Sequence, residues 1–219
     1  MAGSRLESVE SADGRSWSAD AFVFACGPWL PDLFPELMAG LLKVTKQDVV
    51  FYGPAPGDPR YRAEACPVWC EFDGPYYGIP GIDERGFKIA HDLYGPRFDP
   101  TSGERVIAPS SMEATRGYLG LRFPGLAEAP VVETRVCQYE VTPDTHFVLD
   151  RHPGFDNAWI AGGGSGHSFK HGPSIGAYLT GLIGGRTPEQ LEGTEAARFR
   201  LGPRTPGPGV RSAGHSALT

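Results

Sequence analysis

The chain has 219 residues, a formal net charge of −6 and a pI near 5.5. The surplus of negative charge argues against nucleic-acid partners and anionic membranes, which attract basic surfaces. No apolar stretch approaches the roughly 20 residues that a membrane helix needs, and four cysteines are too few for a disulfide scaffold. We therefore expect a protein of a reducing cytoplasm, without nucleic-acid or membrane partners.

The amino-terminal region predicts a hairpin, a buried strand and a short helix. Residues 6–17 alternate around a central Asp-Gly pair, which is typical of a hairpin. Residues 18–27 form an apolar run that ends in small residues, as in a buried strand whose tip lies close to a ligand. After the Gly27-Pro28-Trp29 turn, residues 32–42 predict a helical stretch.

The middle of the chain, residues 44–133, predicts an antiparallel sheet. Short aromatic or β-branched runs alternate there with glycine, proline and aspartate. The runs lie at residues 49–52, 67–72, 76–79 and 86–91. A Ser-Ser-Met-Glu sequence at 110–113 has the pattern of a capping box, which predicts the start of a helix that ends near Leu121.

The last ordered region is predicted to be residues 134–192. Residues 159–161 predict a buried strand, which breaks into a glycine loop, and residues 173–182 predict a helix that two glycines end. From residue 193 the composition turns to Arg, Gly, Pro and Ser without apolar periodicity. Residues 193–219 are therefore expected to form a disordered tail.

One cysteine in this region stands in an unusual setting. Cys137 lies between Arg135 and Tyr139, just before a Thr-Pro-Asp turn at 142–144. In an extended chain Arg135 shares a face with Cys137, and nearby positive charge favours a thiolate. Taken alone, a free cysteine is more often a buried structural residue.

The glycine-rich segment at residues 162–170 is the second notable feature of this region. Glycines after a buried strand let the backbone approach a planar ligand, and a following helix directs its positive end toward that place. Glycine loops are common, so the specificity of this one depends on the Ser-Gly-His-Ser-Phe-Lys sequence within it.

Together these two segments resemble the carboxyl-terminal half of the FAD-dependent amine oxidases typified by monomeric sarcosine oxidase, N-methyltryptophan oxidase and pipecolate oxidase. The resemblance covers roughly residues 5–190. The chain departs from the family at Gln138, where Met or Leu is usual. It also lacks the strand, Gly-x-Gly-x-x-Gly loop and helix that bind the FAD pyrophosphate.

The resemblance implies an α+β fold, with an antiparallel-sheet substrate domain inserted in the remainder of a Rossmann-like FAD-binding domain. Residues 1–43 would be a partial FAD-binding domain, residues 44–133 the substrate domain, and residues 134–192 the return to the FAD-binding domain. It also implies FAD held covalently through Cys137. An absent amino-terminal half would supply the rest of the FAD site.

The resemblance assigns roles to several further side chains. Lys170 would receive the substrate carboxylate, and Lys88 would stabilise superoxide as oxygen reoxidises the flavin. Tyr77 and Tyr139 would border the substrate cavity, and His91 lies one position before a family histidine. The flavin contacts would come from Ala25, Gly27, Trp29, Gly163, Gly164, Ser165, Gly166, His167 and Phe169, with Cys137 and Lys170. The ordinary alternatives are solvent-facing lysines and structural tyrosines.

The expected function is oxidation of small secondary or cyclic amino acids, by hydride transfer to FAD and reoxidation by O2 to H2O2. Two alternatives stay open. In the first alternative, the chain is a truncated, non-catalytic remnant of a substrate domain that is inactive on its own. In the second, it is a flavin dehydrogenase on the same scaffold. His167 and His171 have helical metal spacing, but no third ligand accompanies them, so no metal is expected.

Overall fold

The computed structural model describes residues 4–71 and 73–206, which form two units. One unit contains residues 4–43 and 140–206, and the other contains residues 44–139. The second boundary falls after Tyr139 rather than after residue 133, because one strand, β8 (Val131–Val141), runs through both positions. Each unit has its own sheet and its own hydrophobic core.

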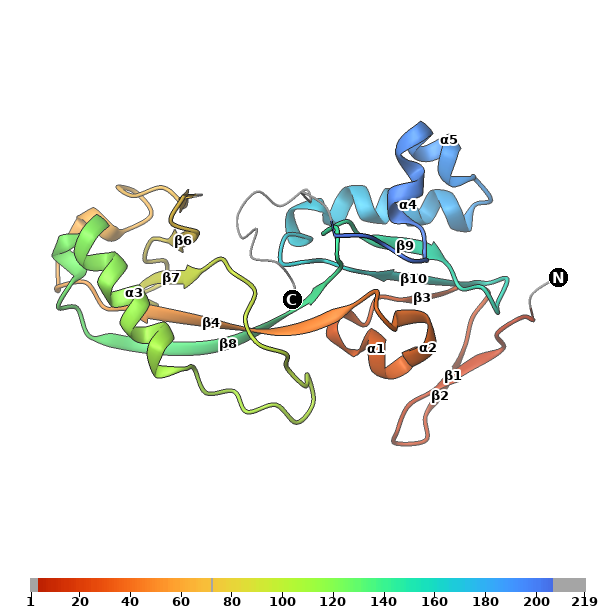
Figure 1. Cartoon of the computed structure of the whole chain (residues 1–219), viewed down its shortest axis with the longest axis horizontal. Coiled ribbons are helices and arrows are strands. Elements are labelled where there is room, and N and C mark those ends of the chain that lie inside the picture. Colours follow the sequence, from red (N-terminus) through yellow and green to blue (C-terminus); the bar gives the residue numbers. More distant parts are fainter. Residues whose placement is uncertain (1–3, 72, 207–219) are drawn as a thin grey trace. The chain divides into compact units, whose positions relative to one another are not determined.

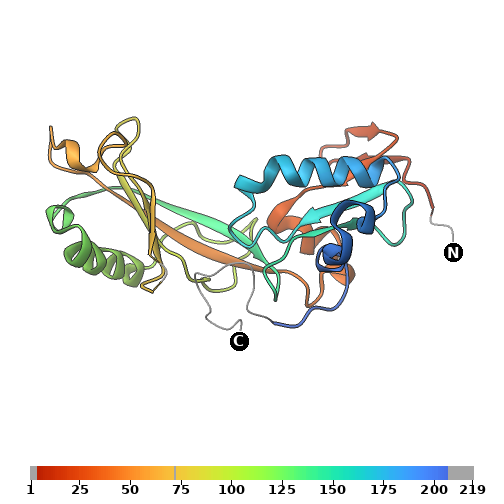
Figure 2. The same ribbon diagram turned by 90° about the horizontal axis from the view of Figure 1, so that it is seen from above.

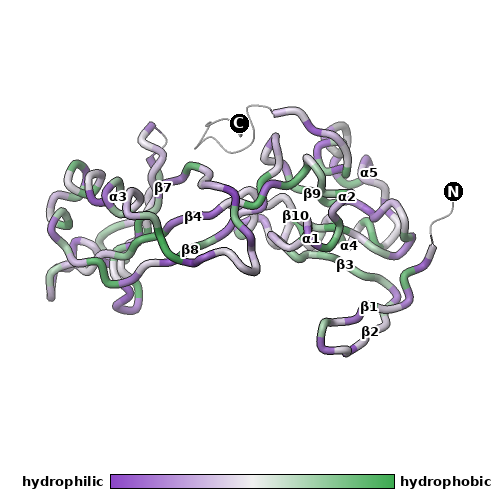
Figure 3. The backbone as a smooth tube through the Cα atoms, turned by 60° about the horizontal axis from the view of Figure 1, so that its bottom comes forward, coloured by the Kyte–Doolittle hydropathy of each residue, from purple (hydrophilic) through white to green (hydrophobic). Residues whose placement is uncertain are grey.

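A three-stranded sheet in the order β3-β10-β9 forms the centre of the first unit (Figure 1). β3 (Phe22–Phe24) runs parallel to β10 (Ala158–Gly162), and β9 (Val148–Arg151) runs antiparallel to β10. Half of the residues in these strands are β-branched or aromatic, and such residues favour extended chain. The hydrophobic stretch of β3 can be followed in Figure 3.

Helices pack on both faces of this sheet, because successive strand residues point to opposite sides. Ile160 faces α1 (Leu30–Leu33) and α2 (Pro35–Met38), where Leu30 and Met38 are buried. Trp159 faces α4 (Gly172–Ile183), which lies along the sheet in Figure 2. The other elements of the unit are β1 (Ser8–Glu10), β2 (Ser16–Ser18), η1 (Gly27–Trp29), η4 (Phe169–His171), α5 (Pro188–Glu192) and η5 (Gly193–Phe199).

The second unit is built on a five-stranded sheet in the order β5-β6-β7-β4-β8. Its remaining strands are β4 (Lys43–Tyr52), β5 (Trp69–Glu71), β6 (Tyr76–Ile79) and β7 (Phe87–His91). The pairs β4–β7, β5–β6 and β6–β7 are antiparallel. On one face, α3 (Pro109–Arg122) packs through Leu119 against a core that includes Tyr52 and Phe87, and η2 (Pro59–Tyr61) and η3 (Pro124–Leu126) add Tyr61 and Leu126.

The predicted capping box at residues 110–113 does not form. Helix α3 begins at Pro109, and the side chain of its N-cap residue, Ala108, makes no capping bond. Instead Asp48 of β4 accepts hydrogen bonds from the Ala108 N–H and the Ser111 hydroxyl, each at 2.8 Å. A carboxylate from a distant strand thus satisfies the first turn of the helix.

The prediction of a disordered tail is wrong for residues 193–206. The Phe199 ring lies 5.5 Å from the Tyr178 ring, and the Arg204 side chain is only 6% exposed. Packing and hydrogen bonds to the rest of the unit order this segment, which composition alone does not reveal. Residues 207–219 of the predicted tail lie outside the described residues.

The predicted α+β fold with antiparallel sheets is confirmed. In the part of the chain that the structure describes, every helix is too short or too polar to span a bilayer.

Candidate functional site

One group of candidate residues lies on the face of the second unit's sheet opposite α3. Val49, Phe51 and Ala90 form its buried floor. Strand register places Lys88 beside Phe51 across the β4–β7 ladder, and Tyr77 beside Ala90 across the β6–β7 ladder. The floor therefore carries two of the residues that the sequence indicated.

Lys88 is a half-buried cation on this face. Its ammonium lies 5.0 Å from the centre of the Tyr77 ring. Burial lowers the pKa of Lys88, Arg135 and Arg85 lower it further, and Cys137 raises it. Among the described residues Lys88 forms no ion pair. The charge is thus available to an anion that approaches this face.

Cys137 and Tyr139 reach the same face from β8, since they are two residues apart on one strand. The Cys137 side chain is exposed. Burial raises the pKa of Tyr139. Three neighbours, Tyr77, Cys137 and Tyr94, raise it further, and Tyr77 also shares a hydrogen bond with Tyr139. The structure therefore brings Lys88, Tyr77, Cys137 and Tyr139 together.

His91 lies on the other face of the sheet. It is three residues from Lys88 on β7, so the alternation of the strand turns it toward α3. Its ring stacks on Tyr76 with centroids 4.6 Å apart, and Tyr76 stacks on Tyr118 of α3 at 4.2 Å. His91 is thus separated from the group around Lys88.

Two residues of this face gave no signal in the sequence, Arg85 and Tyr94. The guanidinium of Arg85 lies 5.5 Å from the Phe51 ring, and that of Arg135 lies 5.8 Å from it. Glu133 pairs with both arginines, and its pKa is lowered, mainly by the Arg135 hydrogen bond. Burial raises the pKa of Tyr94 to about 12. Both residues lie in turns beside β7, where no local pattern identifies a ligand contact.

A second group lies in the first unit, at the carboxyl ends of β3 and β10. Because these strands are parallel, their ends meet at one edge of the sheet, which is the common position of ligands in such folds. β3 leads through the exposed Ala25 to Gly27, at φ +54°, and Trp29 is 40% exposed. β10 leads into the loop of residues 163–167, which we call the glycine loop.

Hydrogen bonds fix the glycine loop to the turn after β8. Gly163 has φ +71°, and a Cβ there would lie 2.8 Å from Thr142 Cγ2. Ser165 is buried at φ +46°, with its hydroxyl 3.3 Å from the Thr142 nitrogen. His167 Nε2 lies 3.0 Å from the Thr145 carbonyl oxygen, and burial lowers the pKa of this histidine. Gly166 is exposed at the tip.

Glu140 connects the glycine loop to the turn after β3, and the sequence did not indicate it. Its Oε1 accepts a hydrogen bond from the Gly164 N–H at 3.1 Å, and its carbonyl accepts one from the Ser165 N–H at 3.0 Å. Its Oε2 lies 3.0 Å from the position that a Cβ of Gly27 would take. Burial raises the pKa of Glu140, and the Gly164 N–H lowers it.

We expect Glu140→Leu to destabilise the first unit by about 1–3 kcal/mol, because the buried Gly164 N–H loses its acceptor. Glu140→Gln keeps an acceptor oxygen and serves as the matched control.

The raised pKa of Glu140 means that the folded chain binds the Glu140 proton more tightly than the unfolded chain does. The free energy of unfolding of the wild type therefore falls as the pH rises from the unfolded-state pKa of Glu140 through its folded-state pKa. Glu140→Gln has no carboxyl group to titrate there and should not show this fall. Thermal unfolding across that pH range measures both effects, and equal melting of Glu140→Leu and wild type would contradict the contact.

The remaining predicted residues, Phe169 and Lys170, are exposed in η4 of the first unit. Phe169 is 100% exposed. The His167 and His171 rings lie 5.9 Å apart, and the described residues contain no cluster of three or more metal-ligating side chains. Lys170 belongs to the first unit, whereas Lys88 and Cys137 belong to the second.

Residues 2–182 match the family model of FAD dependent oxidoreductases. The chain is 33% identical over 194 residues to a monomeric sarcosine oxidase of Arthrobacter sp., covering 84% of this chain and 48% of that protein. It is 30% identical over 194 residues to the human peroxisomal sarcosine oxidase, covering 85% of this chain and 48% of that one. The chain thus spans about half the length of the curated relatives it matches.

Solved structures show the same fold. A fructosyl peptide oxidase from E. terrenum superposes with a TM-score of 0.79 at 20% identity, over 98% of this chain and 52% of that one. Amadoriase II from Aspergillus fumigatus, a fructosamine oxidase, has a TM-score of 0.76 at 22% identity, over 90% and 46% of the two chains.

Proposed function

The chain belongs to the family of FAD-dependent oxidoreductases, and we propose that it forms the flavin-anchoring and substrate-binding part of an amino-acid oxidase. The substrates would be small secondary or cyclic amino acids. The observation that carries this proposal is the exposed Cys137 thiol on the same face as Lys88, Tyr77 and Tyr139. We place the reaction in the cytoplasm, in keeping with four free cysteines.

The residues present fit a flavin. An isoalloxazine ring is planar with polar edges, and the face around Cys137 offers aromatic rings, cations and an accessible thiol. Cys137 would hold the ring through a thioether. In the first unit, the backbone of the Gly27 turn and of the glycine loop would contribute flavin contacts. When bound, the flavin supplies a hydride acceptor for the carbon beside the substrate nitrogen and an electron donor for O2, which becomes H2O2.

Lys88 would act by electrostatics. Its place on a strand ladder would hold a positive charge ready for the negative charge that develops on dioxygen, and a preorganised charge needs no rearrangement during the reaction. Tyr77 and Tyr139 would exclude water from the substrate and orient it. His91 is left out of the proposal because it stacks on Tyr76 at the other face.

Lys170 would bind the substrate carboxylate, for which an exposed, flexible ammonium is suited. We expect Lys170→Met to raise KM for an amino-acid substrate by about tenfold to a hundredfold, with a smaller change in kcat, since a charged hydrogen bond contributes about 1.5–3 kcal/mol. Steady-state kinetics measures this change. The corresponding amine without a carboxylate is the control, and an equal loss for both compounds would remove Lys170 from this role.

The nucleotide end of FAD would be bound by a dinucleotide-binding half outside these 219 residues, acting as a partner of this chain. This part of the proposal draws on the chain's covering about half of each relative. The experiment is to express the chain alone and together with the coding sequence upstream of it. A yellow protein that keeps its flavin after acid precipitation supports the proposal, and a colourless product from the extended form refutes it.

The second candidate is a non-catalytic substrate domain without cofactor, and the partial coverage of the relatives favours it. Reading the DNA upstream of Met1 for an in-frame Gly-x-Gly-x-x-Gly separates the two. A third possibility, a flavin dehydrogenase on the same scaffold, is distinguished by its low yield of H2O2 in air.

A further inference from the structure

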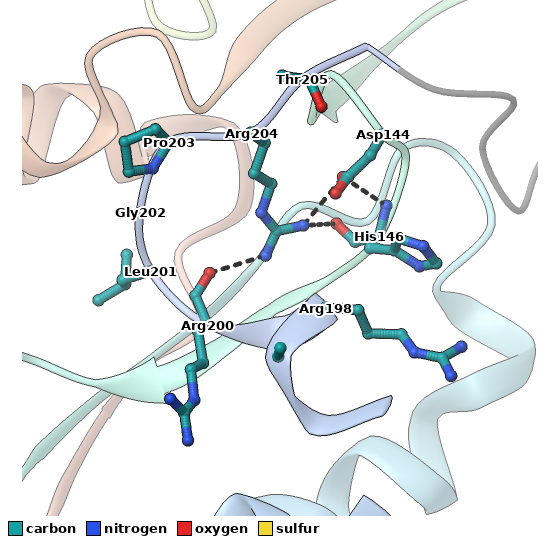
Figure 4. Close-up of a pocket in the computed structure, with 10 residues that line it drawn as sticks. Asp144, His146, Arg198, Arg200, Leu201, Gly202, Pro203, Arg204 and Thr205 are labelled. Carbon is teal, nitrogen blue, oxygen red and sulfur yellow. Dashed lines mark hydrogen bonds and ion pairs between the residues drawn. The ribbon is translucent and has the colours of Figure 1, made fainter. Parts of the chain in front are cut away.

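The last described segment of the chain lies against the turn that holds the glycine loop. We call residues 200–205 the clasp segment. Together with the turn at 144–146 and residues 197–198 it lines an open pocket of about 480 Å³ (Figure 4). The clasp segment is anchored independently by the Leu201 N–H, which donates to Asp150 Oδ2 at 2.8 Å.

Arg204 makes the main contacts between the clasp segment and the turn. One of its terminal nitrogens donates to Asp144 Oδ1 and to the His146 carbonyl oxygen, each at 3.0 Å. The other donates to the carbonyl oxygens of Phe147 at 2.9 Å and Arg200 at 3.0 Å. The Arg204 side chain is only 6% exposed, and Figure 4 shows its guanidinium directed toward Asp144 and the His146 carbonyl.

The same turn also contacts the glycine loop. Thr142 Oγ1 donates to the His146 carbonyl oxygen at 2.7 Å, so Arg204 and Thr142 share one acceptor. Thr145 adopts φ +60°, which is unfavourable for a β-branched residue and needs support from its surroundings. Its carbonyl lies 3.0 Å from His167 Nε2 of the loop. The hydrogen bonds thus run from Arg204 through the turn to His167.

We propose that Arg204 is a positioning residue for the glycine loop, which it holds by fixing the 142–147 turn. Its fork of donors binds one carboxylate and three carbonyl oxygens in fixed directions, which a lysine ammonium cannot reproduce. The role of the loop in flavin binding rests on the proposed function, but the contact itself does not. A test without cofactor therefore separates failure of this inference from failure of the proposed function.

The test is hydrogen exchange on the full chain, resolved to peptides, for Arg204→Ala. We expect amides of residues 142–147 and 163–167 to exchange about tenfold faster, because local opening becomes easier when a buried charged contact is lost. Peptides of β4 and β7 in the other unit should be unchanged. Unchanged exchange in the glycine loop, or faster exchange throughout the chain, would overturn the inference.

Two further measurements keep the test specific. Arg200→Ala is the matched control, since the Arg200 side chain is half exposed and pairs with Glu189, while only its backbone carbonyl contacts Arg204. This variant should leave the loop protected. Millimolar guanidinium should restore protection in Arg204→Ala, whereas Arg204→Lys should stay unprotected. Restoration by lysine, or none by guanidinium, would show that a directed fork of donors is not what holds the turn.

Discussion

Replacing Cys137 with serine is expected to abolish the retention of flavin on the acid-precipitated protein, in a form expressed with its upstream coding sequence. The Cys137 sulfur is exposed, so a flavin ring can reach it without rearrangement of the sheet. A serine hydroxyl is a far weaker nucleophile at neutral pH than a thiolate, so no bond forms in its place. Absorbance of the precipitate and the mass of the intact protein both measure the outcome.

Cys70→Ser is the matched control for this experiment. Cys70 is also an exposed cysteine of the second unit, on β5, and its loss should leave attachment unchanged. Flavin that stays bound in Cys137→Ser would show that another residue forms the bond. Loss of flavin in both variants would point instead to damage of the sheet that carries them.

The second large effect is expected for Lys88→Met. Reoxidation of the reduced enzyme by oxygen should slow by about a hundredfold to a thousandfold, the range found when one preorganised electrostatic group is removed. Reduction by substrate should change much less, because Lys88 is assigned to the oxygen reaction. Rapid-mixing measurements of the two half-reactions separate these rates. Equal slowing of both would contradict the assignment.

The lowered pKa of Lys88 adds a pH dependence to this prediction. Oxygen reactivity of the wild type should fall as pH rises through the folded pKa, since the charge is lost there, and Lys88→Met should lack that fall. The folded chain disfavours the Lys88 proton relative to the unfolded chain, so stability rises with pH between the folded and unfolded pKa values. Below that window Lys88→Met should melt at a higher temperature than wild type. Arg62→Met is the control, because Arg62 is an exposed cation of the same unit and is not among the groups that shift the pKa of Lys88.

The strands of both units follow from local sequence, because short aromatic and β-branched runs between glycines and prolines have few other stable arrangements. The same local logic places Cys137 and Tyr139 on one face of β8, and Lys88 and His91 on opposite faces of β7. What the sequence did not predict depends on distant partners. Asp48 caps a helix that starts about 60 residues later, and Arg204 finds its acceptors in a turn that composition gives no reason to link with it.

Glu140 shows the same limit within the candidate site. A sequence pattern of a known family identified its neighbours Cys137 and Tyr139. The contacts of Glu140 with Gly27 and Gly164 form only when β3 and β10 bring these two glycines close to it. Lys170 shows the reverse case. Its sequence setting is specific, yet in the structure it is an exposed side chain of a short helical turn. Its assignment therefore depends on the kinetic test.

The continuity of β8 fixes the spacing between Cys137 and Glu140. Tyr139 ends one unit and Glu140 begins the other, within a single strand. About 10 Å of extended backbone therefore tethers the thiol to the carboxylate that supports Gly164. Cys137 and Glu140 are three residues apart, so their side chains point to opposite faces of the strand, and deleting one residue between them would bring both to the same face.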